Sequence, residues 1–318
     1  MSAQHALPTP EDVADAHIRI ADSVRRTPTI LCEPSDLLSV ADGPASVTLK
    51  LEQMQHTGSF KARGAFNALL AQPVTEAGVI AASGGNHGAA VAYAARSLGV
   101  RAEIFVPEIS HPAKQARLRG YGAEVHVVGR DFAEALEACE ARRAQTGARL
   151  LHAYDQPEIL AGQGTCALEW VEQAPDLDTL LIAVGGGGLV GGCAAALAGA
   201  KRIVAVETQG TPALNRALAA GEPTTVEVSG LAADSLGART VGALAFEAAA
   251  RFGVESLLVG DEAVRDAQRW LWDRMRQAAE PGGATALAAL LSGAYQPAPG
   301  ERVGVLVCGA NMDPTSLA

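Results

Sequence analysis

The chain has 318 residues, of which 48% are hydrophobic and 19% are charged, and its formal net charge is −10. This length indicates about two domains, and the hydrophobic fraction excludes a disordered chain. The acidic balance gives no electrostatic basis for binding nucleic acid, and no apolar stretch is long enough to span a bilayer. Glycine is abundant, with 34 residues, which suits loops that approach a ligand closely.

The five cysteines are widely spaced and odd in number, and none lies in a CxxC pair. Free thiols in a reducing cytoplasm are therefore expected, whereas a zinc or iron–sulfur site is not. Residues 1–17 contain no basic segment followed by an apolar one, so no secretory signal is expected. These features predict a cytoplasmic protein.

Short β-branched runs alternate with alanine-rich helical stretches, which predicts an α/β protein with largely parallel open sheets flanked by helices. The expected strands are 47–51, 78–82, 103–106, 124–128, 179–184, 203–206 and 302–307. The expected helices include 59–70, 88–98, 132–146 and 262–279. Three strand–helix alternations fall within residues 73–151, so we predict a small domain there, inserted into a large one of residues 1–72 and 152–318.

The first candidate segment, His56 to Gly64, follows the strand 47–51 and enters a helix. Ser59 is the expected N-cap of this helix, which places Lys61 in its first turn. A cation at that position is disfavoured by the helix dipole, so a lowered pKa is expected for Lys61. A neutral lysine can form an imine and act as a base. The alternative is an ordinary solvated lysine.

The second candidate segment is Ser83-Gly84-Gly85-Asn86-His87-Gly88, directly after the strand 78–82. A loop that opens a helix presents backbone N–H groups to an anion, either a carboxylate or a phosphate. His87 is a candidate general base, but a histidine in such a loop more often serves the structure alone.

The third candidate segment is the run of four glycines from Gly185 to Gly188, followed by Leu189. Ordering four consecutive glycines costs much backbone entropy. An anion-binding turn would explain why the chain carries them. The segment also contains the pattern G-x-G-x-x-G, and Glu207 ends the next strand about 20 residues later, as in dinucleotide-binding proteins. A nicotinamide-dependent oxidoreductase is therefore an open alternative at this point.

The fourth candidate segment is Cys308-Gly309-Ala310-Asn311, just past the strand 302–307. Cys308 can offer a small donor to a ligand at the end of that strand, or it can be a buried structural cysteine.

These four segments, in this order and spacing, resemble the serine/threonine dehydratase and serine racemase family of pyridoxal-phosphate enzymes, which have the tryptophan-synthase-β-like fold. The resemblance covers about residues 15–315 and includes 161–165 (Ala-Gly-Gln-Gly-Thr) and 280–283 (Glu-Pro-Gly-Gly). It implies a lyase that converts L-threonine or L-serine to a 2-oxo acid and ammonia. The large domain would bind pyridoxal 5'-phosphate, the small domain would supply the substrate loop, and the dinucleotide pattern becomes a coincidence of glycine-rich turns.

The resemblance also assigns roles to single residues. Lys61 would be the catalytic Schiff-base lysine, and Asn86 would bind the phenolic oxygen of the cofactor. The remaining cofactor-binding positions would flank its ring, cradle its phosphate and contact its pyridine nitrogen; they are Phe60, Gly185, Gly186, Gly187, Gly188, Leu189 and Cys308. The substrate carboxylate would be bound by Ser83 and by the backbone of Asn86 and His87.

Two departures from the family pattern matter. Serine racemases carry a serine where this chain has Gly84, which favours dehydration, although an amino-acid racemase remains the alternative. Members that bind a divalent cation use an acidic residue where this chain has Ala213, so the site beside Glu207 lacks an oxygen ligand and no metal is expected. The resemblance also implies a small amino-acid substrate and a homodimer.

Overall fold

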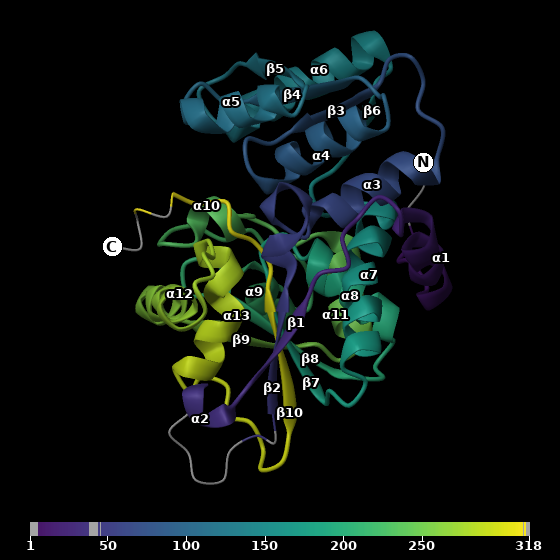
Figure 1. Ribbon diagram of the computed structural model, residues 1–318. Coiled ribbons are helices and arrows are strands. Elements are labelled where there is room, and N and C mark those ends of the chain that lie inside the picture. Colours follow the sequence, from purple (N-terminus) through teal and green to yellow (C-terminus); the bar gives the residue numbers. More distant parts are fainter. Residues whose placement is uncertain (1–5, 38–43, 45, 314, 316–318) are drawn as a thin grey trace.

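The computed structural model describes residues 6–37, 44, 46–313 and 315, and it contains two separate β-sheets (Figure 1). The larger sheet has the strand order β1-β2-β10-β7-β8-β9. Its strands are β1 (Thr29–Cys32), β2 (Ser46–Leu51), β7 (Thr179–Ala183), β8 (Arg202–Thr208), β9 (Glu255–Val259) and β10 (Arg302–Val307). The smaller sheet has the order β5-β4-β3-β6. Its strands are β3 (Val79–Ala82), β4 (Ala102–Val106), β5 (Glu124–Val127) and β6 (Arg149–Leu150).

Both sheets are largely parallel, as the alternation of strands and helices predicts. Among the described strands, the pair β1 and β2 is antiparallel and the other pairs are parallel. All five residues of β7 are buried, as are the last five of β2. Continuous apolar runs suit such strands because helices cover a parallel sheet on both faces. The predicted α/β fold class is confirmed.

Helices lie on both sides of the larger sheet (Figure 1). On one side α13 (Pro281–Leu291) packs against β7 and β10, and α12 (Asp261–Met275) packs on α13. On the other side α8 (Gly188–Leu197) contacts β7 and β8, and α7 (Pro157–Gln173) packs on α8. The other helices of this part are α1 (Pro10–Ile20), α2 (Pro34–Leu37), α9 (Ala213–Ala220), α10 (Ala233–Leu236) and α11 (Ala243–Arg251).

The smaller sheet lies between α6 (Phe132–Thr146) on one face and α4 (Asn86–Ser97) with α5 (Pro112–Gly120) on the other (Figure 1). The bounds of α6 are those expected from the sequence, and the structure shows why. The side chain of Asp131 accepts a hydrogen bond from the N–H of Glu134, and Gly147 ends the helix in the left-handed conformation (φ 72°), which glycine adopts without strain.

The helix α3 (Lys61–Ala71) joins the two layered parts, since it packs on both α7 and α4. A second connection is an ion pair between Lys114 of α5 and Asp234 of α10, with an N–O distance of 2.6 Å. The predicted boundaries of two domains, at residues 72/73 and 151/152, stay a prediction.

Three of the four predicted helices named above have different ends in the structure, and the one expected at 88–98 runs from Asn86 to Ser97. The helix expected at 59–70 begins at Lys61, because Thr57 and Gly58 have positive φ angles of 62° and 79° and Ser59 is extended. The helix expected at 262–279 ends at Met275, because Arg276 is left-handed (φ 54°). Both ends depend on backbone reversals that helical periodicity does not encode.

None of the described helices has the length and apolar character that a membrane crossing requires. Residues 1–5, on which the expectation of no secretory signal partly depends, lie outside the described part of the chain. The core of the larger sheet is built mainly from small and branched aliphatic side chains, and Trp170 is the largest fully buried one.

Candidate active site

Lys61 is the first residue of α3, which begins beyond the end of β2. Two short 3-10 turns, η1 (Glu52–Met54) and η2 (His56–Gly58), connect the two elements. The prediction that Ser59 caps the helix is wrong, because Phe60 occupies the cap position and none of the described side chains caps α3. The hydroxyl of Ser59 is buried and makes no hydrogen bond in the described part of the chain. Contacts other than a capping side chain therefore hold the first turn of α3.

The side chain of Lys61 points to the carbonyl oxygen of Ala153, to which Nζ donates a hydrogen bond of 2.6 Å. Burial lowers the pKa of Lys61 to about 8, while the nearby carboxyl of Glu280 acts in the opposite direction. The lowered pKa agrees with the expectation, but its main cause is desolvation rather than the helix dipole. Nζ also lies 5.1 Å from the centre of the Phe60 ring. Lys61 is thus not an ordinary solvated lysine.

The loop from Gly185 to Gly188 links β7 to α8 and has no room for side chains. A Cβ atom at Gly186 would lie 2.2 Å from the ring of Tyr154, and one at Gly188 would lie 2.8 Å from the Tyr154 carbonyl oxygen. Gly187 is left-handed, with a φ of 89°. The first N–H groups of α8 have no partner inside the helix and attract anions. The loop is therefore suited to a phosphate.

Two of the predicted cofactor-binding positions, Gly185 and Leu189, pack against other parts of the core around the larger sheet. Leu189 is buried in the core of the larger sheet. A Cβ atom at Gly185 would lie 3.0 Å from Cα of Leu236 in α10. Both residues fix the path of the loop by packing.

Ser83 lies in the loop between β3 and α4, and Asn86 is the first residue of α4. The hydroxyl of Ser83 accepts a hydrogen bond from the N–H of Gly85 at 3.3 Å. The amide of Asn86 is held at both ends: Nδ2 donates to Oε1 of Glu280 at 2.6 Å, and Oδ1 accepts from Nδ2 of Asn311 at 2.5 Å. Since an amide nitrogen carries two hydrogens, one N–H of Asn86 remains to donate to a ligand.

The ring of His87 is unsuited to act as a general base. It is buried, and its Nε2 lies 2.9 Å from the carbonyl oxygen of Leu151. Burial and the charge of Lys61 lower the pKa of His87 to about 3, so the ring is neutral at physiological pH. A neutral Nε2 facing a carbonyl must carry the proton. The ring ties α4 to the end of β6, which corrects the idea of a catalytic histidine.

Cys308 follows β10, and its backbone carbonyl accepts a hydrogen bond from the N–H of Phe60 at 3.2 Å. The thiol donates to the carbonyl oxygen of Gly282 at 3.4 Å. Burial, together with the carboxyl of Glu280, raises the pKa of Cys308 well above that of an ordinary thiol. The sulfur is therefore protonated and neutral beside Phe60 and Lys61.

Two polar residues beside Asn86, Glu280 and Asn311, are missing from the predicted set. Burial raises the pKa of Glu280 to about 7, although the hydrogen bond from Asn86 lowers it. Both residues stand in the Glu-Pro-Gly-Gly and Cys-Gly-Ala-Asn segments, which is the signal that could have found them. Ala153 and Tyr154 lie in no such segment. The carbonyl oxygen of Ala153 and the ring of Tyr154 reach the site only through the fold.

The carboxylate of Glu207 accepts hydrogen bonds from the first turn of α9. Its carboxylate oxygens accept hydrogen bonds from the N–H groups of Leu214 and Asn215 at 2.8 and 2.7 Å, and from the hydroxyl of Ser256 at 3.2 Å. Burial raises its pKa to about 7. These contacts use the lone pairs that a cation would need, and Ala213 adds no further oxygen, so the residues here do not fit a divalent cation.

Comparison with known proteins adds independent findings. The profile of the family "pyridoxal-phosphate dependent enzyme" matches residues 20–309. Phenylserine dehydratase of Ralstonia pickettii is 36% identical over 317 residues, which are 98% of this chain and 96% of that protein. L-threonine ammonia-lyase of Thermotoga maritima is 34% identical over 310 residues, or 96% of this chain and 76% of that protein. The solved structure of maize serine racemase superposes with a TM-score of 0.91 and 32% identity, covering 98% of this chain and 96% of that one.

These matches decide between the readings of the glycine-rich loop, because they extend over nearly the whole chain and not over one motif. The alternative interpretation, a nicotinamide-dependent oxidoreductase, is therefore wrong. The chain belongs to the family of pyridoxal-phosphate dependent enzymes, and pyridoxal phosphate is its cofactor.

Proposed function

We propose that this protein is a dehydratase, or ammonia-lyase, which converts L-threonine or L-serine to a 2-oxo acid and ammonia. The observation that carries the proposal is the amine of the half-buried Lys61, held on the carbonyl of Ala153 with a pKa lowered to about 8. Relatives named L-threonine ammonia-lyase and phenylserine dehydratase support the reaction class. An amine with this pKa can exchange a proton near neutral pH, as an α,β-elimination requires.

The donor set fits the cofactor. The N–H groups at Gly185 to Gly188 and the start of α8 would bind its phosphate, with Leu189 behind them. Lys61 would bind it covalently, Phe60 would flank its ring, and Asn86 would donate its remaining N–H to the phenolic oxygen. The neutral thiol of Cys308 would face the pyridine nitrogen. Pyridoxal phosphate supplies an electron sink for the α-carbon of an amino acid.

The chain's own residues supply the remaining chemistry. Ser83 and the backbone N–H groups of Asn86 and His87, at the start of α4, would bind the substrate carboxylate. Nζ of Lys61, once neutral, would accept the α-proton. The Cys308 thiol cannot protonate a ring nitrogen as an acid with a low pKa would, so charge is not held long at the α-carbon and loss of the β-hydroxyl is favoured.

The sequence and the family resemblance support the wider setting of this function. A large cofactor-binding domain of residues 1–72 and 152–318 and a small substrate-loop domain of residues 73–151 accord with the two sheets. A homodimer is proposed from the resemblance. A cytoplasmic location is proposed from the widely spaced cysteines, all of which have buried side chains.

The test is a panel of L- and D-β-hydroxy amino acids, including phenylserine, offered to the full chain loaded with pyridoxal phosphate. Release of the 2-oxo acid and of ammonia is measured, with Lys61→Ala as the control. L-Threonine or L-serine is expected to react, and the control is expected to be inactive. If no L-β-hydroxy amino acid releases ammonia, the proposal is wrong.

The likeness to maize serine racemase favours an amino-acid racemase as the second candidate. Gly84 distinguishes the two, because it places no hydroxyl beside the substrate loop. Its φ is not positive, and an added Cβ would lie 2.8 Å from the Ser110 hydroxyl, which can rotate away. We expect Gly84→Ser to increase D-serine formation from L-serine relative to elimination, as measured by chiral chromatography. Abundant D-serine from the unmodified protein would instead establish the racemase.

A further inference from the structure

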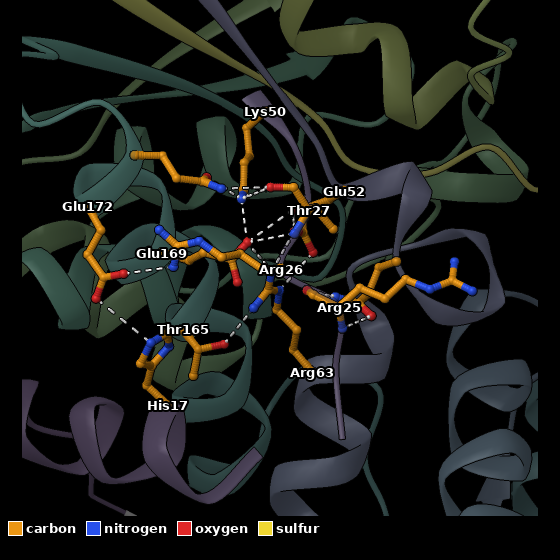
Figure 2. A network of polar contacts seen from close by, with 12 residues as sticks. His17, Arg25, Arg26, Thr27, Lys50, Glu52, Arg63, Thr165, Glu169 and Glu172 are labelled. Carbon is orange, nitrogen blue, oxygen red and sulfur yellow. Dashed lines mark hydrogen bonds and ion pairs between the residues drawn. The ribbon is translucent and has the colours of Figure 1, made fainter. Parts of the chain in front are cut away.

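A cluster of four buried charges lies beside the first turn of α3 (Figure 2). We call it the Arg63 cluster; it consists of Lys50, Glu52, Arg63 and Glu169. Each of these side chains is at most 4% exposed. Two cations and two anions make the cluster neutral. None of the four has a part in the reaction proposed above.

The centre of the cluster is a planar fork between Arg63 and Glu52. Nε of Arg63 donates to Oε2 of Glu52 at 2.8 Å, and Nη2 donates to Oε1 at 2.7 Å. Nη1 of Arg63 also donates to the hydroxyl of Thr165 in α7 at 3.3 Å. Burial alone would raise the pKa of Glu52, but Arg63 and Lys50 outweigh it and hold that pKa below its usual value. A fork of this kind fixes both direction and distance.

The other half of the cluster ties the fork to the larger sheet. Nζ of Lys50, at the end of β2, contacts Oε1 of Glu169 at 2.5 Å and donates to the carbonyl oxygen of Thr27 at 2.8 Å. The same oxygen of Glu169 lies 3.0 Å from Nη2 of Arg63. The hydroxyl of Thr27 donates to Glu52 at 2.5 Å. The cluster thus joins β2, α7 and the segment before β1 to one residue of α3.

Net stabilisation is a poor explanation for such a cluster, because desolvation of buried ions offsets their attraction. Apolar packing does not fix Arg63 on every side either. A cavity of about 150 Å³ borders it, lined by His17, Ala21, Val24, Arg26, Arg63 and Glu169. Within the described part of the chain, no side chain caps α3, the helix that carries Arg63. The hydrogen bonds of the fork therefore help to set the position of this turn, together with the bond from the Phe60 N–H to the Cys308 carbonyl.

We propose that Arg63, through its fork with Glu52, is a positioning residue for Lys61. The two residues share the first turn of α3, so a shift of the guanidinium displaces the backbone from which Lys61 reaches Ala153. This proposal rests on the assignment of Lys61 as the reactive amine. The cluster would keep that amine out of water, although none of its members touches a ligand.

The test replaces the fork while keeping the charge. Arg63→Lys retains the cation, so a direct electrostatic effect on Lys61 is excluded, but an ammonium cannot form two parallel bonds to one carboxylate. The pKa of Lys61 is measured in the full chain, freed of cofactor, from the pH dependence of amine acetylation followed by peptide mass spectrometry. In the loaded protein, the share of cofactor fixed on Lys61 by borohydride is measured as well.

We expect the pKa of Lys61 to rise by one unit or more in Arg63→Lys, which is a tenfold smaller neutral fraction at pH 7, and the fixed share of cofactor to fall. The matched control is Arg142→Lys, which breaks a similar fork of Arg142 with Glu103 in the smaller sheet. Arg142→Lys should lower the melting temperature without changing the pKa of Lys61 or the share of cofactor fixed on it.

An unchanged pKa of Lys61 in a folded Arg63→Lys protein would refute the proposal. If that variant does not fold, Glu52→Asp, which shortens the other arm of the fork by one methylene, is judged by the same criterion. The acetylation profile needs no turnover, so it separates a failure of this proposal from a failure of the proposed dehydratase activity.

Discussion

Replacing Gly186 by alanine tests whether the four-glycine loop is shaped by the ring of Tyr154. The new Cβ would lie 2.2 Å from two ring carbons, whereas carbon atoms in contact stay about 3.5–4.0 Å apart. The ring is not free to swing away, since its hydroxyl donates to the carbonyl of Thr240 at 3.4 Å and its edge packs on His152. Ring or loop must therefore shift by more than an ångström.

Overpacking of this kind costs about 1–3 kcal/mol of unfolding free energy. A chain of this length has an unfolding entropy of about 0.7 kcal/mol per kelvin, so a loss of 2 kcal/mol lowers the melting temperature by about 3 °C. The loss should appear in the protein freed of cofactor. With cofactor it should be larger, because a displaced loop also weakens phosphate binding and removes part of the ligand's stabilisation.

The assay is thermal unfolding with and without pyridoxal phosphate, in four proteins: wild type, Gly186→Ala, Tyr154→Ala and the double variant. With the ring removed, the alanine at position 186 should cost less than half as much. Gly120→Ala is the control, because its Cβ would meet nothing within 4 Å. Equal melting temperatures for wild type and Gly186→Ala, or equal costs with and without the ring, would refute this reasoning.

Three further predictions concern other parts of the site. Lys61→Ala should abolish borohydride fixation of the cofactor, and peptide mapping of the wild type should find the label on Lys61; a label on Lys50 or Lys114 would overturn the assignment. The pKa of Glu280 is raised to about 7, so the folded protein keeps a proton that the unfolded chain releases near pH 4.5, and its stability falls as the pH rises through this range. Glu280→Gln should remove that loss. Denaturant titrations should show the unfolding free energy of the variant rising by up to about 3 kcal/mol relative to that of the wild type between pH 4.5 and 8. A difference between the two proteins that does not change with pH would contradict this. Because the lone pairs of Glu207 are engaged by backbone N–H groups, EDTA should leave the melting temperature unchanged, and a loss of several degrees that magnesium restores would show a cation site.

Local patterns predicted the elements whose ends are set by their own residues. The helix Phe132–Thr146 lies between Asp131 and Gly147, and the strand Arg302–Val307 has the bounds expected for it. The start of α3 was misplaced because Ser59 has the right side chain for a cap but lies in extended backbone after two residues with positive φ.

The site itself was predictable only in part. Lys61, Asn86 and Cys308 stand in recognisable segments, and the structure places them around Glu280. The carbonyl that receives Lys61 and the ring above Gly186 come from residues 153 and 154, which carry no motif. Their roles arise only when β6 and the loop after β7 are brought together, so they depend on tertiary structure and not on spacing.

The place of β10 in the larger sheet has a consequence for biosynthesis. This strand lies between β2 and β7, and it pairs with β2 across residues 302–307 and 46–51. A ribosome delivers the amino-terminal part first, so β2 cannot pair with its inner neighbour until residues 302–307 have been made. The smaller sheet, from residues 79–150, can close much earlier. Lys61 and Cys308 therefore meet only after residue 308 has been made, and we expect shortened chains that lack β10 not to acquire the cofactor.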